Sequence, residues 1–158
     1  MRSDNEGRTA AADPALLALL RELFESQRSA ALATQQEGRP YLSLMAFAAT
    51  PDLKELIVAT ERETRKYANL MAEPRVALLI DNRSNVPADT EEAVAVTVLG
   101  RAAEAQPAER ASLLPLFLAK HPHLETFVTS PTCALITVRV ETYFVVQHFQ
   151  EVQEVKIA

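Results

Sequence analysis

The clearest apolar period along the chain lies near its N-terminal end. Apolar side chains recur there at spacings close to the 3.6-residue repeat of an α-helix, at Leu16, Leu17, Leu19, Leu20, Leu23 and Phe24. Asp13 can accept hydrogen bonds from the first free amides, and Pro14 suits a first helical turn. The pattern therefore predicts an amphipathic helix over residues 14–27.

After this helix, short apolar runs are separated by turn signals such as EGRP and TPDLKE. These runs predict strands over residues 29–35, 40–49, 56–60, 75–81 and 93–105. Gly100, near the middle of the last run, suggests a bulge or a bend. Residues 132–149 are expected to form two strands around a tight Glu141–Thr142 turn, and the weakly alternating tail EVQEVKIA is expected to add an edge strand.

Two segments between these strands predict further helices. Residues 64–72 read as a short helix that ends at Glu73–Pro74, because proline disfavours helical backbone in the residue before it. Residues 107–122 contain a helical run, with Pro115 either inside it or splitting it. Residues 82–92 carry turn residues and are expected to form a loop.

The order of these elements indicates a fold class. Six or seven strands cluster without regular alternation with helices, which argues against a doubly wound parallel sheet. A mainly β (α+β) fold, an antiparallel barrel with short peripheral helices, fits better. With 158 residues and no internal repeat, the chain is expected to form a single domain over residues 13–158. Residues 1–12 are small and polar and are expected to be flexible.

Charge and cysteine content narrow the classes of partner and compartment. The formal net charge is −5, so nucleic acid and anionic membrane surfaces are not expected as partners. No window approaches the roughly 18 continuous apolar residues of a membrane-spanning helix, and the first residues lack the apolar core of a secretory signal. Cys133 is the single cysteine, so no intrachain disulfide can form. A cytoplasmic location is therefore expected.

The few residue types that commonly carry chemistry form no recognised motif. His121 and His123 could hold a metal, but no acid or cysteine stands at a familiar ligand spacing, and a helix stop at the surface is the preferred interpretation. No metal site is expected. His148 is interpreted as ordinary strand packing, and Cys133 as a buried, inert thiol. The three glycines leave no room for a Walker or GxGxxG loop.

The stretch ATERETRKYANL, residues 59–70, is the strongest candidate for a binding site. Thr64 can cap the predicted helix, while Arg65 and Lys66 fall in its first turn, where the helix dipole disfavours a cation unless an anion is present. A phosphate there would receive backbone amides, a hydroxyl and cationic side chains. Glu61 and Glu63 could instead pair with the two cations, so a solvated helix start is the competing interpretation.

Three segments in this order resemble the pyridoxamine 5′-phosphate oxidase-like flavin-binding split barrels: GRPYLSLMAFA, LIVATERETRKYANLMAEPRVALLID and AVAVTVLGRAA. The shared features are a strand that ends in Thr60, the Thr64–Arg65–Lys66 step, the Pro74–Arg75–Val76 step, and a second strand that ends in Gly100. The resemblance covers about residues 29 to 149.

The resemblance implies a six-stranded antiparallel split β-barrel with peripheral helices and a homodimer that binds FMN at the subunit interface. It implies phosphate contacts from Arg65 and Lys66, with Thr60 and Thr64 as hydroxyl or amide donors. Strand 42–46, around Ser43 and Leu44, would supply main-chain contacts to the isoalloxazine ring. Asn69 could reach the phosphate or the ribityl chain, or could simply be a polar residue on the helix surface, and loop 82–86 could contribute from the partner subunit.

The sequence also departs from the oxidases that it resembles. Those enzymes carry an arginine near the position of Ser43, a lysine near Ala48 and a glutamine near Ala95. Their C-terminal tryptophan and arginine have no counterpart here either, since the chain has no tryptophan. The groups that grip pyridoxamine phosphate are therefore missing, and no vitamin B6 oxidase activity is expected.

These considerations leave several functions open. The first is a flavin-dependent oxidoreductase of unknown substrate, with Tyr41, Tyr143 and His148 as acid–base candidates only if they face the flavin ring. The second is a non-catalytic flavin carrier or binding module. The third is haem degradation, because haem utilisation proteins have a similar helix that ends in His–Pro, although they usually continue into a further C-terminal domain. F420 is an alternative phosphate-bearing cofactor.

Overall fold

Seven strands and a set of short helices make up the part of the chain that the computed structural model describes, residues 13–157. The strands are β1 (Ser29–Gln36), β2 (Arg39–Ala49), β3 (Glu55–Glu61), β4 (Arg75–Asp81), β5 (Ala95–Glu104), β6 (Cys133–Gln147) and β7 (Glu151–Lys156). The helices are α1 (Pro14–Ser26), α2 (Arg65–Ala72), α3 (Asp89–Glu92), α4 (Pro107–Lys120), the 3₁₀ turn η1 (Pro122–Leu124) and α5 (Glu125–Val128). The expectation of a flexible N-terminus falls on residues 1–12, outside this description.

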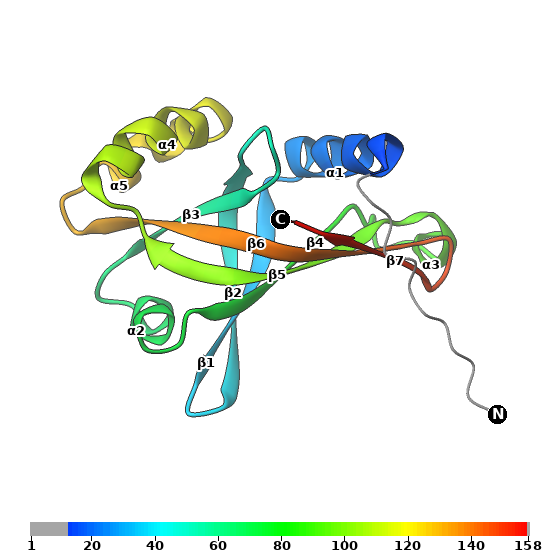
Figure 1. Cartoon of the computed structure of the whole chain (residues 1–158), viewed down its shortest axis with the longest axis horizontal. Helices are drawn as coiled ribbons and strands as arrows, with labels where there is room; N and C mark the ends of the chain where they lie inside the picture. The colour runs from blue at the N-terminus through cyan, green and yellow to red at the C-terminus, as the bar shows by residue number, and fades with distance from the viewer. Residues whose placement is uncertain (1–12, 158) are drawn as a thin grey trace.

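The strands form a closed antiparallel barrel with one strand added outside it (Figure 1). The hydrogen-bonded order is β3-β2-β1-β4-β5-β6-β7, and a further antiparallel ladder between β3 and β6 closes the ring. β7 pairs only with the C-terminal half of β6, from Thr142 to Gln147. The prediction of a mainly β, six-stranded antiparallel split barrel with peripheral short helices is therefore confirmed, and the tail forms the expected edge strand.

The expected Glu141–Thr142 turn is wrong, because β6 runs without a break from Cys133 to Gln147. Leu99 of β5 pairs with Thr142, whereas Gly100 pairs with Val140, so Glu141 is an extra residue in β6. Such a β-bulge shifts the alternation of inward and outward side chains by one position. In the sequence, this shift places two polar residues side by side and imitates the signature of a turn.

Most of the helical predictions agree with the structure. α1 begins at Pro14, and the Asp13 side chain accepts a hydrogen bond from the Ala15 amide, as a helix cap does. Pro115 lies inside α4 on its exposed side and does not split the helix. The expected loop over residues 82–92 contains the short helix α3. Within residues 13–157, no helix has both the length and the apolar character needed to cross a membrane.

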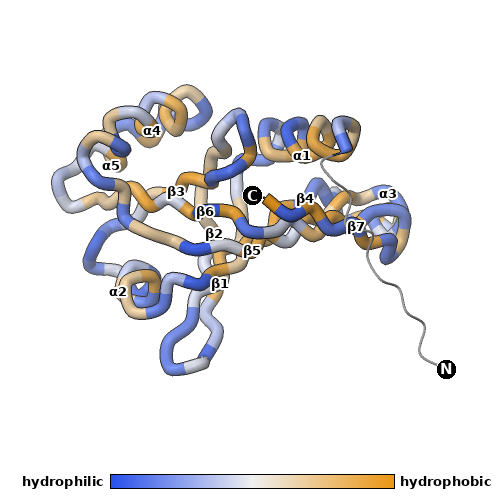
Figure 2. The backbone as a smooth tube through the Cα atoms, viewed as in Figure 1, coloured by the Kyte–Doolittle hydropathy of each residue, from blue (hydrophilic) through white to orange (hydrophobic). Residues whose placement is uncertain are grey.

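The barrel interior and the underside of α1 share one hydrophobic core, whose apolar segments stand out in Figure 2. α1 contributes Leu16, Leu20, Leu23 and Phe24, all buried. The Phe24 ring packs 5.6 Å from the ring of Tyr143, measured between centroids. The Tyr143 hydroxyl donates a 2.7 Å hydrogen bond to the Leu53 carbonyl, so this buried tyrosine also fixes the β2–β3 connection. A second cluster joins α4 to the outer faces of β2, β3 and β6.

Gly100 lies at a close approach of β5 to β6 beside the bulge. A Cβ atom built on Gly100 would overlap the Arg139 carbonyl oxygen and would lie 2.8 Å from Val138 Cγ1. The bend predicted from this glycine is therefore confirmed as a register shift between Leu99 and Gly100.

We expect Gly100→Ala to lower the free energy of unfolding by roughly 3 kcal/mol, the upper end of the usual cost of overpacking, because backbone atoms cannot move aside easily. Gly38→Ala is the matched control: a Cβ there meets nothing within 4 Å, although φ is +79°. This control should cost only about 1 kcal/mol from its left-handed backbone. Urea denaturation measures both, and equal losses would contradict the packing argument.

Candidate functional site

The start of α2 is built by two threonine hydroxyls. Thr64 is the N-cap of α2, and its Oγ1 accepts a 3.2 Å hydrogen bond from the Tyr67 amide while donating to the Glu61 carbonyl at 2.9 Å. Thr60, buried at the end of β3, lies with its Oγ1 3.0 Å from that of Thr64. Both hydroxyls are therefore engaged in shaping this turn. The amides of Arg65 and Lys66, in the first helical turn, have no acceptor within the helix and are available to an anion.

The two cations of this turn are not neutralised by neighbouring acids. The ion pairs within residues 13–157 include neither Arg65 nor Lys66. Glu61, one of the two acids expected to compete, instead accepts a hydrogen bond from the Thr132 hydroxyl. The exposed Arg65 guanidinium lies 5.6 Å from the centroid of the Tyr41 ring on β2, a cation–π contact.

A third arginine of the same stretch is held away from this turn. Arg62 Nε lies 3.0 Å from Glu104 Oε1 on β5, and the Tyr67 hydroxyl donates to the same oxygen at 2.9 Å. The hydrogen bond from Arg62 lowers the pKa of Glu104 below its usual value, so the carboxylate remains charged and keeps the arginine. This cluster ties the β3–α2 connection to β5 and leaves Arg65 and Lys66 as the cations at the start of α2.

A cleft of about 340 Å³ opens beside this turn. It is lined by Leu44, Met45 and Ala46 of β2, Ala59, Thr60 and Glu61 of β3, Thr64 and Lys66 at the start of α2, and Phe117, Leu124 and Phe127 of the α4–α5 segment. The α2 end of the cleft is polar and the α4–α5 end is apolar. Concave sites with a few directed polar groups on an apolar lining are typical ligand sites.

The edge of β2 along this cleft is open. The ladder between β2 and β3 covers only Phe47 to Ala49 on β2, whereas the ladder with β1 runs from Arg39 to Ala46. On the β3 side, main-chain groups of residues 42–46 therefore have no strand partner within the described chain. This is the segment for which the sequence predicts main-chain contacts to a ring. Leu44 faces outward and is 77% exposed, while Ser43 is half-buried and points to the opposite face of the strand.

Asn69 does not line the cleft. It is buried in α2, and its Nδ2 donates a 3.1 Å hydrogen bond to the buried Thr34 hydroxyl of β1. Neither a surface position nor an open ligand contact describes it in this structure. Its side chain instead anchors α2 on the barrel, through a partner, Thr34, that lies 35 residues earlier in the sequence.

Of the three acid–base candidates, only one lies near the start of α2. Tyr143 is fully buried, and burial raises the pKa of its hydroxyl, so it cannot face a ligand in the cleft. His148 lies exposed in the turn between β6 and β7, so the expectation of strand packing is wrong for it. Only Tyr41, 38% exposed and in contact with Arg65, lies near the start of α2.

His121 and Cys133 are both buried. The sequence suggested a surface position for His121, and this is wrong, because the residue is only 1% exposed. Its Nε2 lies 2.8 Å from the Phe47 carbonyl oxygen. Burial lowers the pKa of His121, so the ring is held neutral. Burial also raises the pKa of the Cys133 thiol, which fits the predicted buried thiol. Within residues 13–157 no cluster of potential metal ligands occurs.

Sequence reasoning missed the apolar wall of the cleft. Phe117, Leu124 and Phe127 come from a segment recognised only as helical, and nothing local in it indicates that it folds over β2 and β3. The contacts between α4 and these strands join residues about 60 positions apart, which a single sequence does not reveal.

Comparison with known proteins identifies the fold family. The model of the family described as pyridoxamine 5′-phosphate oxidase matches residues 16–147, most of the chain. The chain belongs to the pyridoxamine 5′-phosphate oxidase-like family. The resemblance inferred from the sequence is thereby confirmed. A search of curated proteins found no match.

Several solved structures share the fold at low sequence identity. General stress protein 26 from Bacillus anthracis is 19% identical with a TM-score of 0.65, over 90% of this chain and 98% of that one. A FAD-binding protein from Mesorhizobium loti is 16% identical with a TM-score of 0.64, over 80% and 88%. A haem-binding protein from Mycobacterium smegmatis is 18% identical with a TM-score of 0.79, over 92% of this chain but only 60% of that one. At these identities the likeness concerns the fold alone.

We expect Asn69→Ala to lower the free energy of unfolding by about 1–3 kcal/mol, because it leaves the buried Thr34 hydroxyl without its donor. Thr34→Val alone should also destabilise the fold, and the double variant should cost less than the sum of the two single variants. Denaturation of all three completes the cycle. If the two losses simply add, the hydrogen bond between Asn69 and Thr34 does not anchor α2.

Proposed function

We propose that this protein binds FMN in the cleft beside α2 and acts as a flavin-dependent oxidoreductase. The observation that carries the proposal is the cleft itself, which joins a cationic helix start to an apolar wall and an open strand edge. FMN has the matching parts, a phosphate, a polar ribityl chain and a flat ring system. The bound flavin would supply the redox chemistry, and the chain would supply binding and orientation.

The phosphate belongs at the start of α2 on physical grounds. The free amides and the helix dipole both favour an anion there. Arg65 and Lys66 add two cations that are unpaired within the described residues, and the hydroxyls of Thr60 and Thr64 fix the turn that presents the amides. Without an anion, two cations at the positive end of a helix would be a local inconsistency of the kind that marks functional sites.

The ring belongs along β2. The main chain around Ser43 and Leu44 offers hydrogen-bonding groups on the edge that β3 leaves uncovered. Phe117 and Phe127 supply an apolar wall opposite. No charged side chain lines this end of the cleft, so the ring would lie in a partly water-excluded environment.

We also propose a homodimer, because the outward face of the sheet beside the cleft is apolar. Leu42 and Leu44 on β2 are 68% and 77% exposed, and Leu79 and Leu99 on β4 and β5 are about 40% exposed. The strand registers place Leu44, Ala31 and Leu79 in one row across three strands, and Leu42, Ala33, Ala77 and Leu99 in the next. Small and apolar residues in two adjacent rows form a flat surface suited to a second copy of itself.

This face is continuous with the cleft through Leu44, which belongs to both. A second copy on the face would therefore cover the flavin and complete its site. Loop 82–86, with the exposed Arg83 beside Asp81, is a candidate contribution from the partner.

Other functions are less well supported. The haem alternative rested on the His–Pro step, but the His121 ring of that step is buried and its Nε2 lies 2.8 Å from the Phe47 carbonyl oxygen, so His121 offers no accessible axial ligand. F420 would use the same phosphate seat, so comparing FMN with F420 separates the two cofactors. A non-catalytic carrier would bind FMN but would not transfer electrons from NADPH to an acceptor. The side chains of Ser43, Ala48 and Ala95 lack the charge and amide groups expected of a B6 oxidase.

The direct test is the absorbance spectrum of the protein before and after incubation with FMN and removal of free flavin. We expect about one flavin per subunit to be retained.

Replacing both Arg65 and Lys66 by alanine should weaken FMN binding by about 3–6 kcal/mol, because each charge-assisted contact contributes roughly 1.5–3 kcal/mol. Lys54→Ala with Arg139→Ala is the matched control, since both residues are exposed at the opposite end of β3. Equal affinities of the two double variants for FMN would contradict the proposal that Arg65 and Lys66 bind its phosphate.

The dimer is tested separately. Leu44→Asp places a charge in the centre of the proposed interface, and we expect it to give a monomer in light scattering after size exclusion, with loss of bound FMN. Phe149→Asp is the control, because Phe149 is 58% exposed in the turn between β6 and β7, outside both the two leucine rows and loop 82–86. A dimer that withstands Leu44→Asp would show that the copies associate through another surface.

A further inference from the structure

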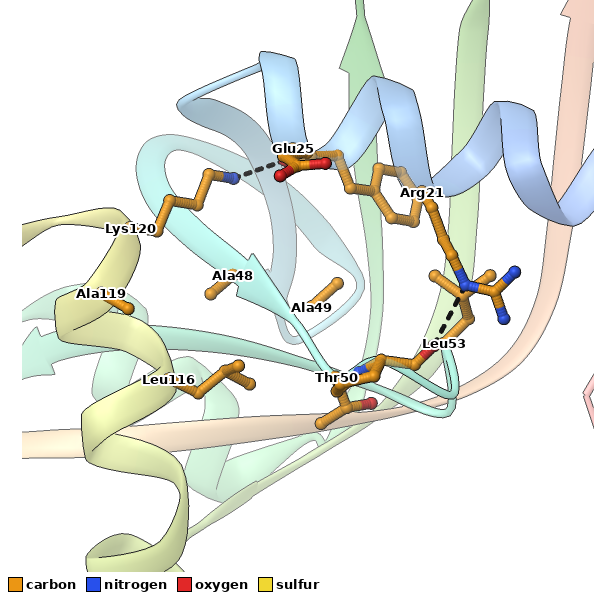
Figure 3. Close-up of a pocket in the computed structure, with 11 residues that line it drawn as sticks. Arg21, Glu25, Ala48, Ala49, Thr50, Leu53, Leu116, Ala119 and Lys120 are labelled. Atoms are coloured by element: carbon orange, nitrogen blue, oxygen red, sulfur yellow. Dashed lines mark hydrogen bonds between the residues drawn. The ribbon is translucent and has the colours of Figure 1, made fainter.

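A second cleft lies between α1 and α4 (Figure 3). Its volume is about 610 Å³, within the range of roughly 300–1,000 Å³ that is usual for small-molecule sites. It is lined by Arg21, Phe24, Glu25, Ala48, Ala49, Thr50, Pro51, Leu53, Leu116, Ala119 and Lys120. None of these residues lines the flavin cleft.

The floor of this second cleft is apolar and made of small side chains. Ala48 and Ala49 of β2 lie between the two helices, with Leu116 and Ala119 on the α4 side (Figure 3). Alanines at these positions leave open a volume that larger side chains would fill. The cleft can therefore accept an apolar body without displacing any part of the core.

Lys120 fixes a cation at one end of this floor. Its Nζ donates a 2.6 Å hydrogen bond to the Phe24 carbonyl and lies 3.7 Å from the centroid of the Phe47 ring. It thereby caps the C-terminal end of α1, which has no basic residue of its own in its last turn. An ammonium has three donors, and one hydrogen bond leaves two for a ligand.

The Lys120 ammonium has no acidic partner that compensates its charge within the described residues. Burial, and next the neighbouring Arg28, lower the pKa of Lys120 to about 8, while Glu25 raises it. Glu25 does not form an ion pair with Lys120 within the described chain. The adjacent His121 ring is held neutral by burial, and Arg21 is tied at the opposite end to the Pro51 carbonyl. An anion placed on Lys120 would therefore restore stabilisation that the ammonium has lost.

We propose that the cleft between α1 and α4 binds a small apolar carboxylic acid, with its carboxylate on Lys120 Nζ and its apolar body over Ala48, Ala49 and Leu116. This inference is independent of the flavin proposal. It rests on the cleft, its alanine floor and the anchored lysine. If Lys120 only capped α1 and packed on the Phe47 ring, the lysine would be required, but the open apolar floor beside it would not.

The test is calorimetric titration of the full-length protein with decanoate, and with decyltrimethylammonium as a ligand of the same chain length and opposite charge. We expect decanoate to bind at one site and the cationic ligand not to bind. Ala119→Trp fills the cleft from an exposed position and should abolish binding. Ala108→Trp is the control, because Ala108 is exposed in the first turn of the same helix and does not line the cleft.

Proton uptake gives a second signature that non-specific apolar binding would lack. Because burial lowers the pKa of Lys120 to about 8, a bound carboxylate should raise this pKa and make the amine take up a proton. We expect proton uptake on decanoate binding that is larger at pH 8 than at pH 7, measured in buffers of different ionisation enthalpy. Lys120→Arg should still bind decanoate but without this uptake, and Lys120→Met should bind at least tenfold more weakly.

Several outcomes would overturn the proposal. They are an absence of decanoate binding, equal binding of the cationic ligand, unchanged binding in Ala119→Trp, or proton uptake that persists in Lys120→Arg. Because FMN is left out of the titrations, a failure of the flavin proposal would not affect this result. Retention of FMN by the Lys120 variants, in turn, would show that the two clefts act separately.

Discussion

The ladder between β3 and β6 is the constraint on which the remaining architecture depends. Seven residue pairs, from Glu55 with Arg139 to Glu61 with Cys133, join the third strand to a strand more than 70 residues later. This pairing closes the barrel, and it also fixes where β3 ends. Because α2 begins four residues after β3, the position of its cationic first turn is set by barrel closure rather than by the helix itself.

The same closure leaves a gap in the wall. β3 pairs fully with β6 but with only three residues of β2, so the two strands diverge and the edge of β2 opens beside the start of α2. The α4–α5 segment covers part of the gap with aromatic and aliphatic side chains. The cleft is thus a product of strand geometry, and its polar and apolar ends come from segments that are far apart in the sequence.

The extent to which the sequence predicts this structure depends on how local each signal is. Helix 14–27 and the cap at Thr64 rest on neighbouring residues, and both are found. The Glu141–Thr142 turn failed, because the bulge at Glu141 depends on the distant Gly100. The buried bond of Asn69 and the buried ring of His121 were also missed, since each has its partner on another element. The sequence assigned Lys66 and Thr60 to one candidate site, and both line the cleft, but it could not supply the apolar wall opposite them.

β7 covers the edge of the C-terminal half of β6. Without it, the C-terminal half of β6, rich in valine and aromatic residues, would present unpaired main-chain groups to any extended chain. With β7 in place, the outermost strand is the mainly polar segment EVQEVK, which carries the charged residues Glu151, Glu154 and Lys156. Charged edge strands are poor templates for strand addition. The tail therefore protects the C-terminal half of β6 from strand addition, which leaves the open edge of β2 and the broad faces of the barrel as surfaces for contact with other molecules.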